Sequence, residues 1–197
     1  MKGYVPNVVE AEGRMERSWD LLSRLLKDRI VFVTGEIEDN MASVIIAELL
    51  YLDSEGEEDI TLYVNSPGGS VPAGLAIIDT MHLLNCDVST VAMGCCASMG
   101  VMILSQGTKG KRFILPHGEV MIHQPLGGIK GQATDIQITA EHIIDTKNML
   151  AEMIAEATGQ DKEKVLRDME RDYWLKANKA LEYGIVDEIF TKKWKRG

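Results

Sequence analysis

Short β-branched runs that alternate with helical stretches constrain the fold of this chain more than any other feature of its sequence. Residues 30–33, 60–64 and 88–92 are typical of buried strands, and apolar residues at helical spacing follow each of them. An alternation of this kind favours a mostly parallel sheet with right-handed crossovers. We therefore expect an α/β fold.

The same spacing predicts the remaining elements. Helices are expected over residues 15–26, from a cap at Asn40 through Leu50, over residues 71–84 and from near Met99, and strands over residues 113–115 and 120–122. A glycine-rich stretch at residues 126–131 then precedes a long amphipathic helix that Thr134 or Asp135 could cap and that ends at Gly159. Its apolar stripe needs a partner, which is either the core or another subunit.

Length and composition bound the domain count and the function classes. The 197 residues suit one domain, with no linker or repeat to divide it. No window approaches the roughly 18–20 apolar residues that cross a bilayer. The N-terminus lacks the pattern of a secretory signal, so we expect a cytoplasmic protein. A net charge of −9 disfavours nucleic acid as a partner, because phosphate contacts need clustered basic residues.

Cysteine and histidine spacing gives no sign of a cofactor. Cys86, Cys95 and Cys96 form neither a disulfide framework nor a metal-ligand pattern. No histidine pair makes an H-E-x-x-H motif, and the chain has no G-x-x-x-x-G-K-[ST] nucleotide loop. We therefore expect no metal and no cofactor.

Ser98 is the first candidate for chemistry. The segment Gly94-Cys95-Cys96-Ala97-Ser98-Met99-Gly100 predicts a tight turn of small residues between a strand and a helix. Small neighbours let a substrate carbonyl approach the hydroxyl, and free N–H groups at a helix start can stabilise an oxyanion. A serine that merely caps the helix explains this motif alone slightly better.

A second strand-to-helix turn contains Asn65-Ser66-Pro67-Gly68-Gly69-Ser70. Paired glycines let the backbone come close to a ligand or present N–H groups to it. Gly69 together with Met99 would supply the two donors of an oxyanion hole. An ordinary turn with Pro and Gly in their usual places is the simpler interpretation of this segment alone.

His123 and Asp172 are weaker candidates on position alone. His123 follows the strand at residues 120–122, where a general base is commonly found, but a structural histidine is equally consistent. Asp172 lies beside Tyr173 and Trp174, yet its region is rich in charge, and Asp168, Glu170 or Asp187 could equally be chosen.

Taken together, these motifs resemble the caseinolytic serine peptidases called ClpP over nearly the whole chain. Residues 63–70 resemble the family's oxyanion segment, 97–100 its nucleophile turn, 121–125 its histidine strand and 170–172 its third catalytic element. The resemblance implies the spiral α/β fold that this family shares with the crotonases. It also implies one domain over residues 1–197, with an axial-pore segment at residues 1–18 and a glycine strand and protruding handle helix at residues 126–159.

The resemblance also implies the mechanism. Ser98 would be the nucleophile, His123 the general base and Asp172 the orienting carboxylate, with the Gly69 and Met99 amides as the oxyanion hole. A peptide would add as a strand between two segments near the site. The substrate-binding residues so implied are Gly68, Val71, Pro125 and Leu126.

Assembly and partners follow from the same resemblance. Subunits of the family form two stacked seven-membered rings around a closed chamber, and an ATP-dependent AAA+ unfoldase feeds them unfolded polypeptide. The apolar pocket for the unfoldase would consist of Tyr63, Leu83, Val91, Met93, Leu115 and Phe190.

Four residues depart from the family's usual pattern. Cys96 stands where alanine is common, Thr61 replaces a frequent aromatic, and Lys176 and Lys179 lie in a segment that usually reads Ser-Ala-x-Glu-Ala. Lys176 follows Asp172 by four residues, where a cation could pull the carboxylate away from His123. Docking could be altered, and the ring could be mixed with a paralogue from the same family instead of being formed by this chain alone.

Two other functions stay open at this point. A crotonase-like acyl-coenzyme A hydratase or isomerase also uses two backbone amides as an oxyanion hole, but it needs acidic catalysts and has no use for a serine with a histidine partner. A ring subunit with a degenerate site would act only as a scaffold. Labelling of Ser98 by a fluorophosphonate separates the first from a peptidase, and a peptidase assay separates the second.

Overall fold

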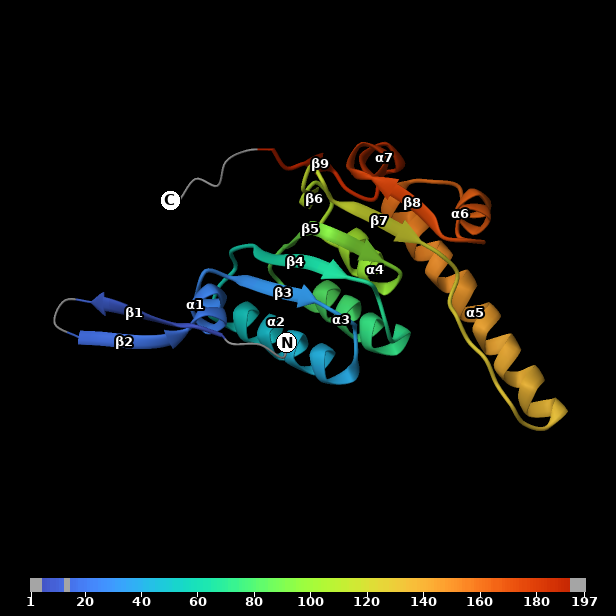
Figure 1. Cartoon of the computed structure of the whole chain (residues 1–197), viewed down its shortest axis with the longest axis horizontal. Coiled ribbons are helices and arrows are strands. Elements are labelled where there is room, and N and C mark those ends of the chain that lie inside the picture. The colour runs from blue at the N-terminus through green and yellow to red at the C-terminus, as the bar shows by residue number, and fades with distance from the viewer. Residues whose placement is uncertain (1–4, 13–14, 192–197) are drawn as a thin grey trace.

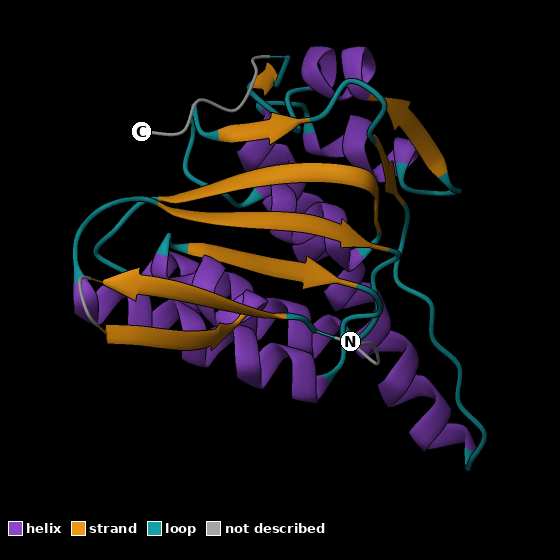
Figure 2. Cartoon of the chain, turned by 60° about the vertical axis from the view of Figure 1, so that its left-hand side comes forward, coloured by secondary structure: helices purple, strands orange, loops and turns teal. Residues whose placement is uncertain are grey.

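The computed structural model describes residues 5–12 and 15–191. Its centre is a seven-stranded sheet in the order β3-β4-β5-β6-β9, with β7 beside the second half of β5 and β8 beside β7 (Figures 1 and 2). The strands are β3 (Ile30–Thr34), β4 (Ile60–Ser66), β5 (Val88–Ala97), β6 (Arg112–Ile114), β7 (Glu119–Ile122), β8 (Tyr173–Lys176) and β9 (Glu188–Ile189). All pairings are parallel except that of β7 with β8. The predicted α/β class is therefore confirmed.

Helices cover one face of this sheet. They are α1 (Leu21–Lys27), α2 (Asp39–Glu55), α3 (Val71–Leu83), α4 (Met99–Ser105), α5 (Ala133–Thr158), α6 (Lys162–Asp168) and α7 (Ala177–Tyr183). Burial alternates along β4, so that Leu62 and Val64 pack into the core with α2 and α3 while Tyr63 faces the other side. The core thus lies between the sheet and the helices.

Helix α5 is buried along only part of its length. Leu150, Ala151 and Ile154 are in the core, whereas Ile138 and Ile144, nearer its start, are 60% and 56% exposed. Figure 1 shows this first half projecting away from the sheet, with the segment before it running alongside. Within the described chain the core therefore covers one half of the apolar stripe and leaves the other half open.

Three helix boundaries differ from the prediction. Residues 15–20 are the strand β2 (Met15–Asp20), which pairs with β1 (Asn7–Glu12), and Asp20 caps α1 by accepting a hydrogen bond from the Ser23 amide. The predicted cap at Asn40 is wrong, because Glu38 precedes the first residue of α2. The predicted caps at Thr134 and Asp135 are also wrong, because α5 begins two or three residues earlier, after Gln132. Gly159 ends α5 in a left-handed conformation, as predicted.

Two other segments also differ from the prediction. The small residues at 94–97 belong to β5, because the strand changes neighbours: Ala92 pairs with Ile114 of β6, and Ala97 pairs with Met121 of β7. Residues 126–131 form no strand in the described chain, which offers them no neighbouring strand to pair with. The predicted axial-pore segment at residues 1–18 lies partly outside the described residues; its described part contributes to the β1–β2 hairpin.

Candidate active site

Ser98 lies between the end of β5 and the first residue of α4. Its φ of 54° and ψ of −124° are unusual for a residue with a side chain, and such conformations gather at functional sites. The Ser98 amide donates to the Met121 carbonyl at 2.9 Å, and its own carbonyl accepts from the Val101 amide. The neighbouring strand β7 and the first turn of α4 therefore fix this strained residue.

The two glycines of the second turn make close contacts, Gly68 with Ser98 and Gly69 with Ile37. Gly68 has a φ of +97°, and a Cβ on it would lie 2.6 Å from the Ser98 Cβ and 3.0 Å from the Met99 nitrogen. Gly69 has a φ of +151°, and its Cβ would lie 2.2 Å from the Ile37 carbonyl oxygen. Only glycines permit these two approaches, and the first places Gly68 against the start of α4.

The amides of Gly69 and Met99 donate no hydrogen bond to another described residue. The neighbouring Gly68 amide is bonded to Ser66 Oγ at 3.1 Å, and the Ser70 amide to the Ile37 carbonyl at 2.8 Å. Two free amide donors beside a strained serine are what an oxyanion hole requires.

His123 follows the last residue of β7, and Asp172 precedes the first residue of β8. Because these strands pair antiparallel with Ile122 opposite Tyr173, both side chains emerge at the same end of the ladder. His123 Nδ1 and Asp172 Oδ1 are 3.2 Å apart. With Nδ1 protonated, as this contact requires, Nε2 is left as a proton acceptor.

Ser98 and His123 line one small cavity of about 20 Å³. Val71 and Pro125, two of the predicted substrate-binding residues, line it as well. Of the other two, Gly68 touches Ser98 as described, and Leu126 is 86% exposed outside the cavity. No hydrogen bond joins Ser98 to His123 among the described residues. Catalytic hydrogen bonds are often open before substrate binds.

The departures at Cys96 and Lys176 leave the contact between His123 and Asp172 intact. Cys96 is fully buried, and its thiol donates to the Val64 carbonyl at 3.0 Å. Burial raises its pKa to about 12, so the thiol stays protonated. Lys176 is at the far end of β8 from Asp172, and no ion pair between them is found in the described chain. Lys179 pairs instead with Glu182.

Five of the six predicted docking residues share the sheet face that the helices leave open. Tyr63 pairs with Val91, Met93 and Leu115 follow along the same face, and the Phe190 ring packs against Phe113 with centroids 5.6 Å apart. Leu83 is not with them in the described chain. It lies in the last turn of α3, on the other face, and is 77% exposed.

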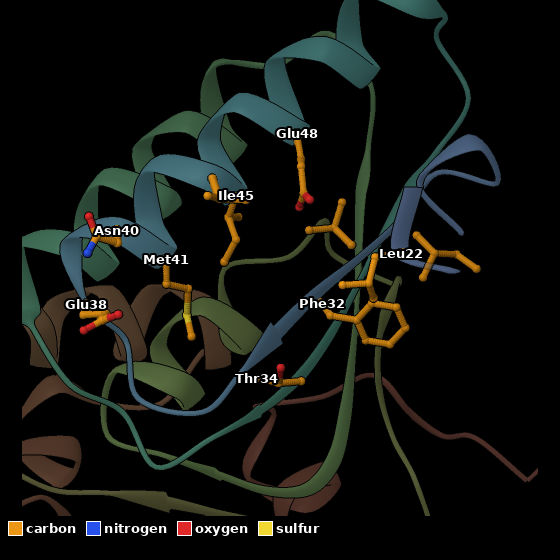
Figure 3. A pocket seen from close by; sticks show the side chains of 11 residues that line it. Leu22, Phe32, Thr34, Glu38, Asn40, Met41, Ile45 and Glu48 are labelled. Atoms are coloured by element: carbon orange, nitrogen blue, oxygen red, sulfur yellow. The ribbon is translucent and has the colours of Figure 1, made fainter. Parts of the chain in front are cut away.

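A larger cavity, of about 310 Å³, lies away from these groups, between α1, β3 and α2. Figure 3 shows Leu22, Phe32 and Met41 around it, together with the carboxylate of Glu48. Burial raises the pKa of Glu48. This cavity contains no serine, cysteine or histidine, so the smaller cavity at Ser98 is the candidate active site.

Sequence reasoning missed Gln124, which connects the two halves of the site. Its amide donates to the Met169 carbonyl at 2.7 Å, and its side-chain Nε2 donates to the Glu170 carbonyl at 3.0 Å. Its place beside His123 was the only signal available. Among residues 5–12 and 15–191, no cluster of His, Cys, Asp and Glu could hold a metal ion, and no helix is long and apolar enough to cross a membrane.

Comparison with known proteins gives a consistent result. The family model of the Clp protease matches residues 13–193. The curated relatives include three proteins named ATP-dependent Clp protease proteolytic subunit. That of Ligilactobacillus salivarius (strain UCC118) is 53% identical over 192 residues, which cover 97% of this chain and 98% of the relative. Those of Streptococcus thermophilus (strain ATCC BAA-491 / LMD-9) and Streptococcus pneumoniae (strain P1031) are 57% and 56% identical over 190 residues, which cover 95% of this chain and 97% of each relative.

Proposed function

Since the chain belongs to the Clp protease family, we propose that Ser98, His123 and Asp172 form its catalytic triad. The protein is a serine-type endopeptidase, the proteolytic subunit of an ATP-dependent protease that cleaves unfolded proteins to short peptides. One observation carries the assignment of residues. His123 is held by Asp172 at 3.2 Å while it lines the same small cavity as Ser98.

The reaction proceeds in two halves. His123 Nε2 takes the proton of the Ser98 hydroxyl as the oxygen attacks the peptide carbonyl carbon. The tetrahedral intermediate collapses, the C–N bond breaks, and His123 gives its proton to the leaving amine. Water then attacks the acyl-enzyme while His123 takes its proton. The bond between the acyl carbon and Ser98 Oγ breaks, His123 returns the proton to Ser98 Oγ, and the peptide leaves with a new carboxyl terminus. Asp172 keeps the imidazole oriented and stabilises the imidazolium.

The amides of Gly69 and Met99 bind the negative oxygen of both tetrahedral intermediates. Their free N–H groups and the close packing of Gly68 on Ser98 support this role. Loss of one such donor costs roughly 100- to 1000-fold in turnover number in other enzymes. The crotonase alternative loses its basis, because the chain belongs to the peptidase family and the groups beside the two amides are a serine and a histidine.

Partners and assembly form the second part of the proposal. An AAA+ unfoldase supplies the ATP dependence and docks on the open sheet face around Tyr63, Val91 and Met93. Subunits assemble into two stacked seven-membered rings, of this chain alone or mixed with a paralogue. The exposed apolar side chains on the first half of α5 support burial of this helix against another subunit. The chain acts as one domain, with residues 1–18 at the axial pore and residues 126–159 as handle, in the cytoplasm.

The test compares Ser98→Ala with Ser89→Ala. Ser89 lies near the start of β5, the strand that leads to Ser98, and its hydroxyl donates to the Lys111 carbonyl away from the cavity. Assembled wild-type particles should bind a fluorophosphonate covalently and cleave a short fluorogenic peptide. Ser89→Ala should do both at a rate close to that of wild type, and Ser98→Ala should lose the label and at least about 1000-fold in turnover. Labelling or turnover that survives in Ser98→Ala would overturn the assignment.

A further inference from the structure

We infer that Gln124 is a positioning residue that holds His123 and Asp172 against each other. The inference rests on the catalytic triad proposed above and extends it by one residue. Gln124 is not among the described residues that line the cavity at Ser98. It acts through the backbone segment that carries Asp172.

The hydrogen bonds of Gln124 hold the chain around His123 and Asp172 together beyond the end of the β7–β8 ladder. On one side, the β7–β8 ladder ends with Ile122 opposite Tyr173. On the other side, the Gln124 amide donates to the Met169 carbonyl at 2.7 Å and Nε2 donates to the Glu170 carbonyl at 3.0 Å. The residue after His123 is thus bound to residues just before Asp172, so that backbone contacts bracket the pair.

This bracket matters because burial does little to fix Asp172. Its side chain is 62% exposed, whereas that of His123 is only 16% exposed. A carboxylate so open to water stays beside the imidazole only if the backbone at residues 170–172 is held in place. A displacement of about 1 Å in a catalytic group can cost on the order of 100-fold in rate.

The Glu170 side chain ties the same segment to α5. Lys147 Nζ on α5 lies 2.9 Å from Glu170 Oε2, and Gln124 Nε2 lies 3.4 Å from Glu170 Oε1. The hydrogen bond from Lys147 holds the pKa of Glu170 below its usual range, so the carboxylate is charged near neutral pH. Gln124 Nε2 therefore has two acceptors on Glu170, and the backbone carbonyl is closer than the carboxylate.

The experiment is a double-mutant cycle between Gln124→Met and Asp172→Asn. Methionine keeps the length of the side chain and removes the N–H donor. In the Asp172 background we expect Gln124→Met to lower kcat on a short fluorogenic peptide by about 10- to 100-fold, with KM unchanged within about twofold. In the Asp172→Asn background the same change should lower kcat by less than about twofold, because the carboxylate that Gln124 positions is already lost.

Gln160→Met is the matched control, since Gln160 Nε2 donates to the Tyr183 carbonyl at 2.9 Å outside the cavity. Its kcat should stay within about twofold of wild type. Lys147→Met is a second variant that keeps both Gln124 bonds to backbone carbonyls, and it should lose less than Gln124→Met. Particle size and urea midpoint are measured for every variant, so that loss of assembly or fold is seen directly.

The outcomes separate this inference from the catalytic assignment. An equal loss of kcat from Gln124→Met in both backgrounds, or no loss in either, overturns the positioning role and leaves the triad in place. Full turnover in Asp172→Asn alone overturns the role of Asp172, and the inference with it.

Discussion

Replacing Arg112 by methionine is expected to destabilise the fold by about 3–5 kcal/mol. The Arg112 side chain is 1% exposed, and it forms a two-pronged ion pair with Asp187, with Nη2 2.7 Å from Oδ1 and Nε 2.9 Å from Oδ2. Its remaining N–H groups donate to the carbonyls of Ser105, Ala157 and Gly184 at 2.9–3.1 Å. One side chain therefore joins the ends of α4, α5 and α7 to the sheet.

The magnitude follows from what the substitution leaves behind. Methionine fills the volume of the arginine stem, so the loss is mainly electrostatic. Asp187, with a side chain 16% exposed, loses its counter-charge, and three carbonyls lose their donor. Removing one partner of a buried ion pair costs about 3–5 kcal/mol, whereas replacing both by apolar residues often costs little. We therefore expect Arg112→Met/Asp187→Leu to be at least about 1 kcal/mol more stable than Arg112→Met.

The contribution of this pair should depend on pH. Burial raises the pKa of Asp187, but hydrogen bonds and the charge of Arg112 outweigh it and hold that pKa below the usual 3.8. A carboxyl whose pKa is lower in the folded state stabilises the fold above its unfolded pKa, and this contribution is lost as the pH falls through the folded value. The stability difference between wild type and Asp187→Asn should be largest near neutral pH and should shrink below about pH 3.8.

The assay is urea unfolding followed by tryptophan fluorescence, at one fixed protein concentration because the assembly proposed above would add to apparent stability. Lys109→Met is the control. Lys109 Nζ is 3.9 Å from the same Asp187 carboxylate, but its side chain is 69% exposed, so its loss should change the free energy of unfolding by no more than about 0.5 kcal/mol. The reasoning fails if Arg112→Met costs less than about 1 kcal/mol, or if the double variant is less stable than Arg112→Met.

Two further predictions concern the surroundings of Ser98. Gly68→Ala would place a Cβ 2.6 Å from the Ser98 Cβ, so fluorophosphonate labelling should slow at least about tenfold. Gly110→Ala is the control. Gly110 has a similar φ of +85°, but a Cβ there would meet nothing within 4 Å, so this variant should label at the wild-type rate. Labelling of Gly68→Ala at the wild-type rate would contradict the packing argument. Cys96, with a pKa of about 12, should resist iodoacetamide at pH 8 until urea unfolds the chain. Mass spectrometry that finds Cys96 alkylated in the folded protein as fast as in urea would contradict its burial.

Much of the fold could be predicted because the local signals are strong. The β-branched run at Ile30–Thr34 and the helix that ends at Gly159 follow from periodicity and end signals alone. The strand at residues 15–20 could not be found this way, because its apolar residues fit a helix equally well and its partner β1 is recognised only in three dimensions. The extension of β5 through Ala97 could not be predicted either, because the strand that pairs with it, β7, lies more than twenty residues later in the sequence.

The candidate site divides along similar lines. Turns with paired glycines and a serine at a helix start are local patterns, so Gly69 and Ser98 could be proposed from sequence. The choice of Asp172 over Asp168 or Asp187 could not be made from the residues alone, because it depends on which carboxylate meets His123 across the β7–β8 ladder. Asp168 forms an ion pair with Lys164 and accepts a hydrogen bond from the Tyr183 hydroxyl, and Asp187 forms an ion pair with Arg112. These partners become visible only once the chain is folded.

The antiparallel ladder between β7 and β8 also bears on how this chain can tolerate insertions and deletions. His123 and Asp172 are 49 positions apart along the chain, yet the register of β7 against β8 brings them to the same end of the ladder. Residues gained or lost between the strands, at the far tip of α5 for example, leave that register untouched. A single residue gained or lost within either strand would turn its side chains to the opposite face and separate the two groups. Length variation among natural and engineered versions should therefore be found in the chain between β7 and β8 and be absent from these two short strands.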